Sequence, residues 1–236
     1  MNIPAEFDEI RPYTPEELPQ VFDELVADPA FQAVINVIMP GVPLEALSHQ
    51  LHQCKTNLEV QATIFYPLLH KIIKEHSDGF TLNASSLPDK EKNYTFISNH
   101  RDIVLDPGFL SLGLLDNQFP NTVEIAIGDN LLIYPWIKKL VRVNKSFIVQ
   151  RALSMRQMLQ ASARMSRYIH FAITEKKENI WIAQREGRAK DSNDRTQESV
   201  LKMLALAGKD DAVDSLKELN IVPTSLSYEY DPCDFL

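Results

Sequence analysis

The segment YTFISNHRDIVLDP, residues 94–107, decides the fold class of this chain. Its first four residues form a short β-type run, and a polar segment follows them directly. Similar runs recur at 123–127, 146–149, 179–183 and 221–228, and helical patterns separate several of them. Strands that alternate with helices predict an α/β fold with a mixed, largely parallel central sheet that helices cover.

Residues 1–80 have a different pattern, which predicts a small helical N-terminal domain ahead of an α/β domain over residues 81–236. Thr14 and Pro15 have the residue types of a helix start. The helix over 57–76 should be kinked or split at Pro67, because proline lacks the amide proton. The other helices are expected over 30–38, 44–51, 154–174, 196–207 and 210–219. The chain stops directly after its last expected strand, which is typical of a missing C-terminal portion.

The composition excludes several classes of protein. The 236 residues are 44% hydrophobic and 24% charged, which is close to the soluble globular average and excludes a disordered chain. No pair of the 7 glycines frames a dinucleotide-binding or Walker-type loop. The N-terminus has no apolar signal-peptide core, and no apolar stretch approaches the roughly 20 residues that span a bilayer. We therefore expect a cytoplasmic protein whose contact with a membrane can only be peripheral.

Cysteines and histidines give no indication of a metal site. Cys54 and Cys233 are too few for a metal cluster or a disulfide framework, and we expect two reduced thiols. The histidines of the N-terminal region lack a carboxylate-rich partner in the sequence, so we expect surface or half-buried imidazoles. These histidines are His49, His52, His70 and His76.

The polar segment after the first strand carries the strongest candidate for chemistry. His100 follows the strand, and Asp106 stands six positions later at an expected helix start. A carboxylate that accepts from Nδ1 fixes the imidazole tautomer and leaves Nε2 as a general base. Asp106 with Pro107 also has the residue types of a helix N-cap followed by proline, and that role alone would explain both residues. Asp102 is a rival partner, but its i, i+2 spacing from His100 directs it to the opposite face of an extended chain.

No protein nucleophile accompanies His100. The G-x-S-x-G motif is absent, and no cysteine is near His100 in the sequence. A histidine–aspartate pair without a nucleophile predicts direct attack by a substrate hydroxyl or by water.

The net charge of −8 conceals a basic block. Residues 138–195 contain 14 basic and 5 acidic side chains, a local charge of +9 that leaves −17 for the rest of the chain. Part of the block is the solvated face of a long helix. Four cations, however, crowd the loop after strand 179–183, where arginine can hold a phosphate with two hydrogen bonds and lysine can add a point charge. These are Arg185, Arg188, Lys190 and Arg195. We expect no nucleic-acid partner, because aromatic residues for base stacking are not interleaved with the block.

Together these segments resemble the glycerolipid acyltransferase family, which transfers fatty acyl groups from thioesters to glycerol phosphates. Four blocks occur in the family's order and span residues 93–228. They are Asn99-His100 with Asp106-Pro107, Phe147-Ile148 with Arg151, the NIWIA strand running into Glu186-Gly187-Arg188, and Ile221-Val222-Pro223. The most similar branch is that of the soluble plastid-type glycerol-3-phosphate acyltransferases, whose first motif also ends in Asp-Pro.

Two positions depart from the family's pattern. Five residues rather than four separate His100 from Asp106, so the turn between them must carry one extra residue. Arg151 stands one place later than expected after Phe147-Ile148. A bulge could absorb either shift, or the shift could accompany an altered activity.

The resemblance implies a mechanism and its ligands. His100 would be the general base that deprotonates the acceptor hydroxyl, and Asp106 its orienting partner. The alkoxide would attack the thioester of acyl-carrier protein or acyl-coenzyme A, with no covalent acyl-enzyme and no further cofactor. The acceptor would be glycerol-3-phosphate or a lysophosphatidate. Its phosphate would be held by Arg151, Arg188 and Lys190, with Arg185 as a further member.

Several alternatives stay open at this point. A basic surface formed by Lys138, Lys139 and Arg142 would suit acyl-carrier protein, anionic lipid headgroups or simple solvation. The apolar stretches 109–115 and 221–226 are explained by the core or by a groove for the acyl chain. Two other functions remain: a non-catalytic protein of the same fold that binds phospholipids or phosphate esters, and a thioester hydrolase in which His100 activates water.

Overall fold

The computed structural model describes residues 2–87, 89–151, 154–190, 193–209, 211–230 and 232, so Cys233 lies outside the described residues. The chain divides into two compact units. The helical unit comprises residues 10–80 and 127–148, and the sheet unit comprises residues 1–9, 81–126 and 149–236. The first eighty residues are thus shared between the units, and a second segment completes the helical unit.

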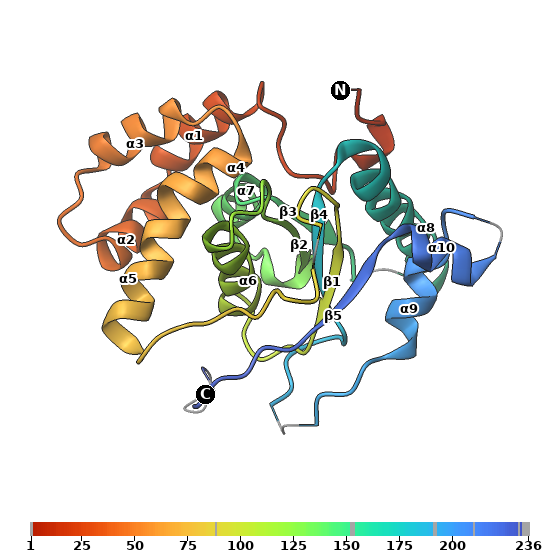
Figure 1. Cartoon of the computed structure of the whole chain (residues 1–236). Helices are drawn as coiled ribbons and strands as arrows, with labels where there is room; N and C mark the ends of the chain where they lie inside the picture. Colours follow the sequence, from red (N-terminus) through yellow and green to blue (C-terminus); the bar gives the residue numbers. More distant parts are fainter. Residues whose placement is uncertain are drawn as a thin grey trace. The chain divides into compact units, whose positions relative to one another are not determined.

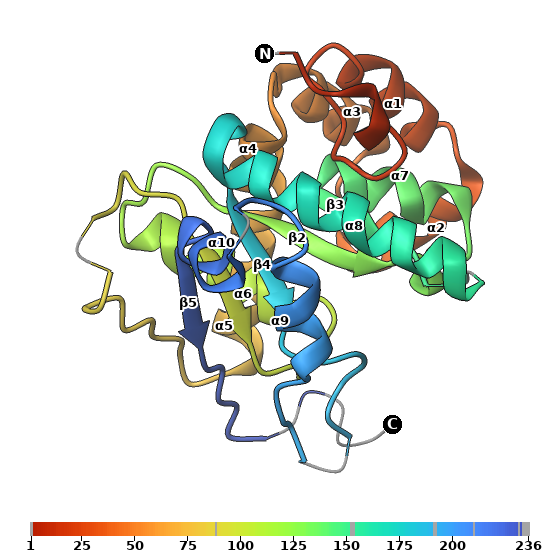
Figure 2. The same cartoon turned by 90° about the vertical axis from the view of Figure 1, so that its right-hand side faces the viewer.

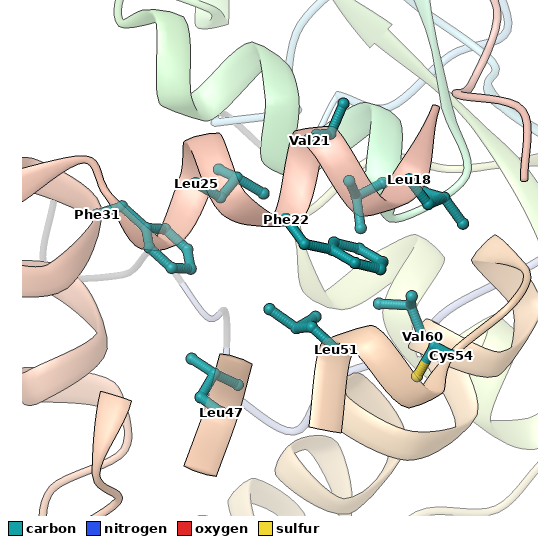
Figure 3. Packing of buried hydrophobic residues seen from close by; sticks show 10 residues of the cluster. Leu18, Val21, Phe22, Leu25, Phe31, Leu47, Leu51, Cys54 and Val60 are labelled. Carbon is teal, nitrogen blue, oxygen red and sulfur yellow. The ribbon is translucent and has the colours of Figure 1, made fainter. Parts of the chain in front are cut away.

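The helical unit is built around one apolar core. Its helices are α1 (Leu18–Val26), α2 (Pro29–Ile38), α3 (Leu44–Gln53), α4 (Asn57–Val60), α5 (Tyr66–His76) and α7 (Pro135–Val143), with the short helix η3 (Asp129–Leu131). Figure 3 shows Phe22 of α1 directed toward Leu51 of α3 and Val60 of α4. Cys54 lies in the same core, and burial raises the pKa of its thiol.

Helix α1 begins three residues after the expected start at Pro15. The Glu17 carboxylate accepts from the backbone amide of Thr14 and from Nη1 of Arg11, each at 2.6 Å. The amide of Glu17 in turn donates to the Thr14 carbonyl at 3.0 Å. Residues 14–17 therefore form a separate turn, and the helix starts only at Leu18.

The helical segment over 57–76 is continuous, but it changes its helix type ahead of the proline. A π-helical segment, η2 (Gln61–Phe65), separates α4 from α5. Pro67 lies in the first turn of α5, where its missing amide proton is no loss. The wider π-helical turn ahead of it accommodates the proline ring, so the chain stays helical through Pro67.

Five strands form one sheet in the order β3-β2-β4-β1-β5 (Figure 1). They are β1 (Thr95–Ser98), β2 (Val123–Gly128), β3 (Ser146–Val149), β4 (Asn179–Ala183) and β5 (Ile221–Thr224). The β1–β4, β1–β5 and β2–β4 pairs are parallel. This arrangement confirms the predicted α/β fold class. Pro223 is tolerated in β5 because this strand lies at the sheet edge.

Helices cover both faces of the sheet within the sheet unit. Figure 2 shows α9 (Glu198–Leu204) and α10 (Ala212–Glu218) in front of β4 and β5, with α6 (Leu105–Asp116) behind them. The remaining helices of this unit are η1 (Ala5–Phe7) and α8 (Met155–Phe171), which η4 (Ala172–Lys176) continues.

The two sheet faces differ in what they bury. On one face Phe96 and Trp181, which are register partners, pack with Leu110 and Leu114 of α6. The stretch 109–115 thus supplies mainly core residues rather than a groove. On the face toward α8, the buried Glu124 accepts from the Tyr168 hydroxyl at 2.6 Å.

Candidate functional site

Strand register places the candidate residues at one edge of the sheet. Ser98, the last residue of β1, is level with Ala183 of β4 and Thr224 of β5. Because these strands are parallel, the segments that follow them leave the sheet side by side. Ligands of open parallel sheets bind at this carboxyl edge.

His100 and Asp106 contact each other directly. Nδ1 of His100 lies 3.0 Å from Oδ2 of Asp106, within the range of a hydrogen bond. The Asp106 side chain is fully buried, and the His100 residue is only 8% exposed. Trp181 of β4 meets the imidazole edge-to-face, with ring centroids 5.8 Å apart. The ring is therefore held by a carboxylate at one atom and by an aromatic side chain beside it.

The extra residue between His100 and Asp106 is accommodated by the loop backbone. Oδ2 of Asp106 also accepts from the amides of Arg101 and Asp102, at 2.8 and 3.0 Å. These two hydrogen bonds hold the backbone of the loop against the carboxylate. A five-residue separation is consequently compatible with the histidine–aspartate contact.

The N-cap interpretation of Asp106 is wrong. Helix α6 begins at Leu105, and Asp106 is its second residue. The carboxylate of Asp102 accepts from the amides of Val104 and Leu105, at 2.8 and 2.7 Å, and so closes the turn that enters the helix. Asp102 is therefore engaged with the backbone, and Asp106 is the carboxylate that contacts His100.

Two residues distant in the sequence complete this arrangement, and sequence reasoning missed both. The Tyr228 hydroxyl donates to Oδ1 of Asp106 at 2.8 Å. The backbone amide of His100 donates to Oδ2 of Asp194 at 2.8 Å. These partners are 122 and 94 residues away along the chain, so local patterns contain no signal for either contact.

The loop after β4 is joined to His100 through Ala189. The amide of Ala189 donates to the His100 carbonyl at 2.9 Å, and Nη1 of Arg101 donates to the Ala189 carbonyl at 3.3 Å. Arg188 and Lys190 flank Ala189 in the sequence, and Arg188 is half-buried while Lys190 is exposed. Two of the predicted phosphate-binding residues are therefore next to the residue that contacts the His100 backbone.

Of the other two predicted phosphate-binding residues, Arg185 lies earlier in the same loop and Arg151 contacts it. Arg185 donates to the carbonyl of Asn193 at 2.8 Å, which closes the loop on itself. Arg151, two residues beyond the end of β3, forms an ion pair with Glu186 at 3.3 Å. The structure thus gathers all four cations at one loop, although their contacts differ.

A polar pocket of about 500 Å³ lies at the same edge of the sheet, and none of the four predicted phosphate-binding cations is among its described lining residues. Its described lining consists of Asn99, Arg101, Gln184, Asp194 and the run Thr224, Ser225, Leu226, Ser227 and Tyr228. Arg101 is the one cation within that described lining, and it was absent from the sequence-based set. The Asp194 carboxylate accepts from the His100 amide and from Nε2 of Gln184. The hydroxyl, amide and guanidinium groups of the lining suit a ligand that carries hydroxyls and a negative charge.

Two of the three cations on the helix before β3 are engaged within the helical unit, and the third, Lys138, is exposed. Lys139 pairs with Glu24 at 2.7 Å. Arg142 is buried, donates to the Arg11 carbonyl at 2.8 Å and places its guanidinium 4.1 Å from the Tyr13 ring centre. These two side chains stabilise the helical unit instead of forming a docking surface.

Two further properties concern ions and membranes. Among the described residues, no group of three or more His, Cys, Asp and Glu side chains could hold a metal ion. One of the N-terminal histidines, His52, lies 3.2 Å from the Asp23 carboxylate.

Within the described part of the chain, every helix is too short or too polar to cross a membrane.

Comparison with known proteins adds one positive finding. Residues 60–226 match a family model described as Acyltransferase. This match contains the His100–Asp106 pair, the loop after β4 and β5. No curated protein matches the sequence.

Proposed function

The chain belongs to the acyltransferase family, and we propose that it moves a fatty acyl group from an acyl thioester to a hydroxyl of glycerol-3-phosphate or of a lysophosphatidate. Its family makes it an acyltransferase of lipid metabolism with an acyl donor and a glycerolipid acceptor. The finer proposal rests above all on the buried 3.0 Å contact between His100 and Asp106 at the carboxyl edge of the sheet. The donor is a thioester of acyl-carrier protein or of coenzyme A.

The histidine acts as a general base in this proposal. With the Nδ1 proton donated to Asp106, the Nε2 atom of His100 accepts the proton of the acceptor hydroxyl. The resulting alkoxide oxygen attacks the thioester carbonyl carbon and forms a tetrahedral intermediate. Collapse of the intermediate breaks the carbon–sulfur bond, and the imidazolium returns its proton to the leaving thiolate. The products are an ester and a free thiol, and no acyl group is attached to the protein.

The cations around the site favour an acceptor that carries a phosphate. Arg188 and Lys190 stand on either side of Ala189, whose amide contacts the His100 carbonyl. Arg101 adds a guanidinium in the pocket lining. Guanidinium groups bind phosphate oxygens through paired, charge-assisted hydrogen bonds. A phosphate held at this loop would bring the hydroxyl of the same molecule to His100.

Replacement of His100 by alanine tests the proposal. We expect His100→Ala to lower kcat for acyl transfer at least about a hundredfold, because general-base catalysis contributes on that order. The assay measures ester formation from acyl-coenzyme A or acyl-carrier protein with glycerol-3-phosphate and with lysophosphatidate. His76→Ala, which changes an exposed histidine of the helical unit, serves as the matched control.

The same assay separates the alternatives. Thioester consumption that requires no acceptor would identify a hydrolase. Glycerol-phosphate binding that depends on Arg188, with no turnover of any thioester, would identify a non-catalytic binding protein. Full activity in a folded His100→Ala protein would rule out the proposed mechanism.

A further inference from the structure

The buried carboxylate of Asp106 divides its two oxygens between different partners. Oδ2 accepts from Nδ1 of His100 and from the amides of Arg101 and Asp102. Oδ1 accepts from the hydroxyl of Tyr228 at 2.8 Å. A fully buried charge needs a donor at each oxygen. Tyr228 therefore supplies the donor to Oδ1, whereas the donors of the His100 loop bind Oδ2.

The segment that carries Tyr228 is itself fixed beside the end of β1. The amide of Leu226 donates to Oδ1 of Asn99, and Nδ2 of Asn99 donates to the Leu226 carbonyl, both at 2.8 Å. The Tyr228 ring lies near Phe109 of α6, with ring centres 6.3 Å apart. The hydroxyl is thus placed at Asp106 by a two-point backbone contact and by ring packing.

We infer that Tyr228 is a positioning residue of the transfer reaction, which holds the Asp106 carboxylate so that Oδ2 remains directed at His100 Nδ1. The inference rests on the proposed function of His100. In this role Tyr228 acts through Asp106. Without a donor at Oδ1, the three donors at Oδ2 alone hold the carboxylate, which can then tilt about its Cβ–Cγ bond and weaken its hydrogen bond to Nδ1. Tyr228 also lines the pocket, but its hydroxyl proton is donated to Asp106, so we assign the hydroxyl to the carboxylate and not to the acceptor.

The orientation of the Asp106 carboxylate matters most when the His100 imidazole becomes charged. As His100 takes the acceptor proton, the imidazolium depends on a nearby, correctly oriented carboxylate. Binding of the substrates does not depend on this charge. Loss of the Tyr228 hydroxyl should therefore act on kcat and spare the KM values of donor and acceptor.

Tyr228→Phe tests the inference in the whole 236-residue chain. The phenyl ring keeps its packing against Phe109, and the hydroxyl that donates to Asp106 is removed. We expect kcat to fall about tenfold with both KM values unchanged, the effect of losing one hydrogen bond to a charged group. In proton NMR spectra, the resonance of the His100 Nδ1 proton should shift upfield and broaden, a readout that requires no turnover.

The control and the combined variant make the result specific. Tyr230→Phe makes the same chemical change two residues on, at a side chain that is 79% exposed, and should leave both readouts unchanged. In a His100→Ala background, Tyr228→Phe should cause no additional loss, because both changes affect one unit. A Tyr228→Phe protein with the wild-type kcat and an unmoved Nδ1 resonance overturns the inference and leaves His100 as the base. Full activity in His100→Ala overturns the proposed function and this inference together.

Discussion

Gly208 is a residue of the sheet unit at which one added methyl group would overlap its neighbours. Its backbone has a φ of +91°, a conformation that residues with a side chain rarely adopt. A Cβ atom there would lie 2.5 Å from Cε1 of His170 and 2.7 Å from Oγ of Ser215. His170 cannot easily move away, because its ring nitrogens lie 2.8 Å from the Glu218 carboxylate and 3.1 Å from the Leu204 carbonyl.

Gly208→Ala should therefore destabilise the protein. We expect a loss of about 1–3 kcal/mol in the free energy of unfolding from overpacking, in addition to the backbone cost. Gly41→Ala is the control, since Gly41 has a similar φ of +82° and no atom within 4 Å of the added Cβ. Urea denaturation of both variants measures the difference. Equal losses in the two variants would show that backbone conformation alone accounts for the effect.

At the scale of an element, the start of α1 is set by a charge contact rather than by helix propensity. Burial acts to raise the pKa of the Glu17 carboxyl, but hydrogen bonds from Arg11 and from the Thr14 amide outweigh it. The net result is a pKa below the ordinary value of 4.5. Between the folded-state pKa and the higher unfolded-state pKa, the unfolded protein consequently binds more protons than the folded protein. The free energy of unfolding therefore rises with pH across this interval.

This contact predicts a pH dependence that Glu17→Gln should weaken. The contribution of Glu17 is complete above its unfolded-state pKa and is lost as pH falls through its lower folded-state pKa. Urea denaturation between about pH 6 and about pH 3 should show a shallower decline in stability for the variant. Glu75→Gln, at an exposed position of α5, controls for the loss of a carboxylate. An identical pH slope in wild type and Glu17→Gln would contradict this account of the turn.

At the scale of the whole molecule, the net charge is negative, whereas the charge around the candidate site is positive. The chain carries −8 overall, yet the loop after β4 presents Arg185, Arg188 and Lys190 at the carboxyl edge of the sheet. A cluster of like charges can attract an anionic ligand even when the protein repels it at long range. Salt screens such attraction, since the Debye length falls to about 8 Å at physiological ionic strength.

Acceptor binding should therefore depend on salt and on this loop. Arg188→Ala should raise the KM for glycerol-3-phosphate about tenfold, the cost of one charge-assisted contact to phosphate, and should change kcat little. The rise of KM with added salt should also be smaller in the variant than in wild type. Lys202→Ala, which removes an exposed cation of α9, is the control. An unchanged KM in Arg188→Ala would place the phosphate elsewhere.

The regular elements were predictable because their signals are local. The bounds of β3 and β4 agree with the expected runs at 146–149 and 179–183, since buried strands consist of continuous apolar residues. The last strand was expected over 221–228 but ends at Thr224. Beyond it, the Asn99 side chain rather than a neighbouring strand binds the backbone of Leu226. The local sequence pattern is the same whether a neighbouring strand or a side chain binds the backbone.

The sequence by itself determined the alternation of strands and helices, the family, and His100 and Asp106 as the candidate pair, because backbone periodicity and short motifs are properties of neighbouring residues. Only the tertiary structure decided which partners complete the pair. Tyr228 and Asp194 reach it because β1, β4 and β5 pair in parallel and in one register, which brings together segments that are about a hundred residues apart. Tertiary structure likewise decided that Arg142 is buried rather than exposed. The residues that contact its guanidinium, Arg11 and Tyr13, are far from it in the sequence.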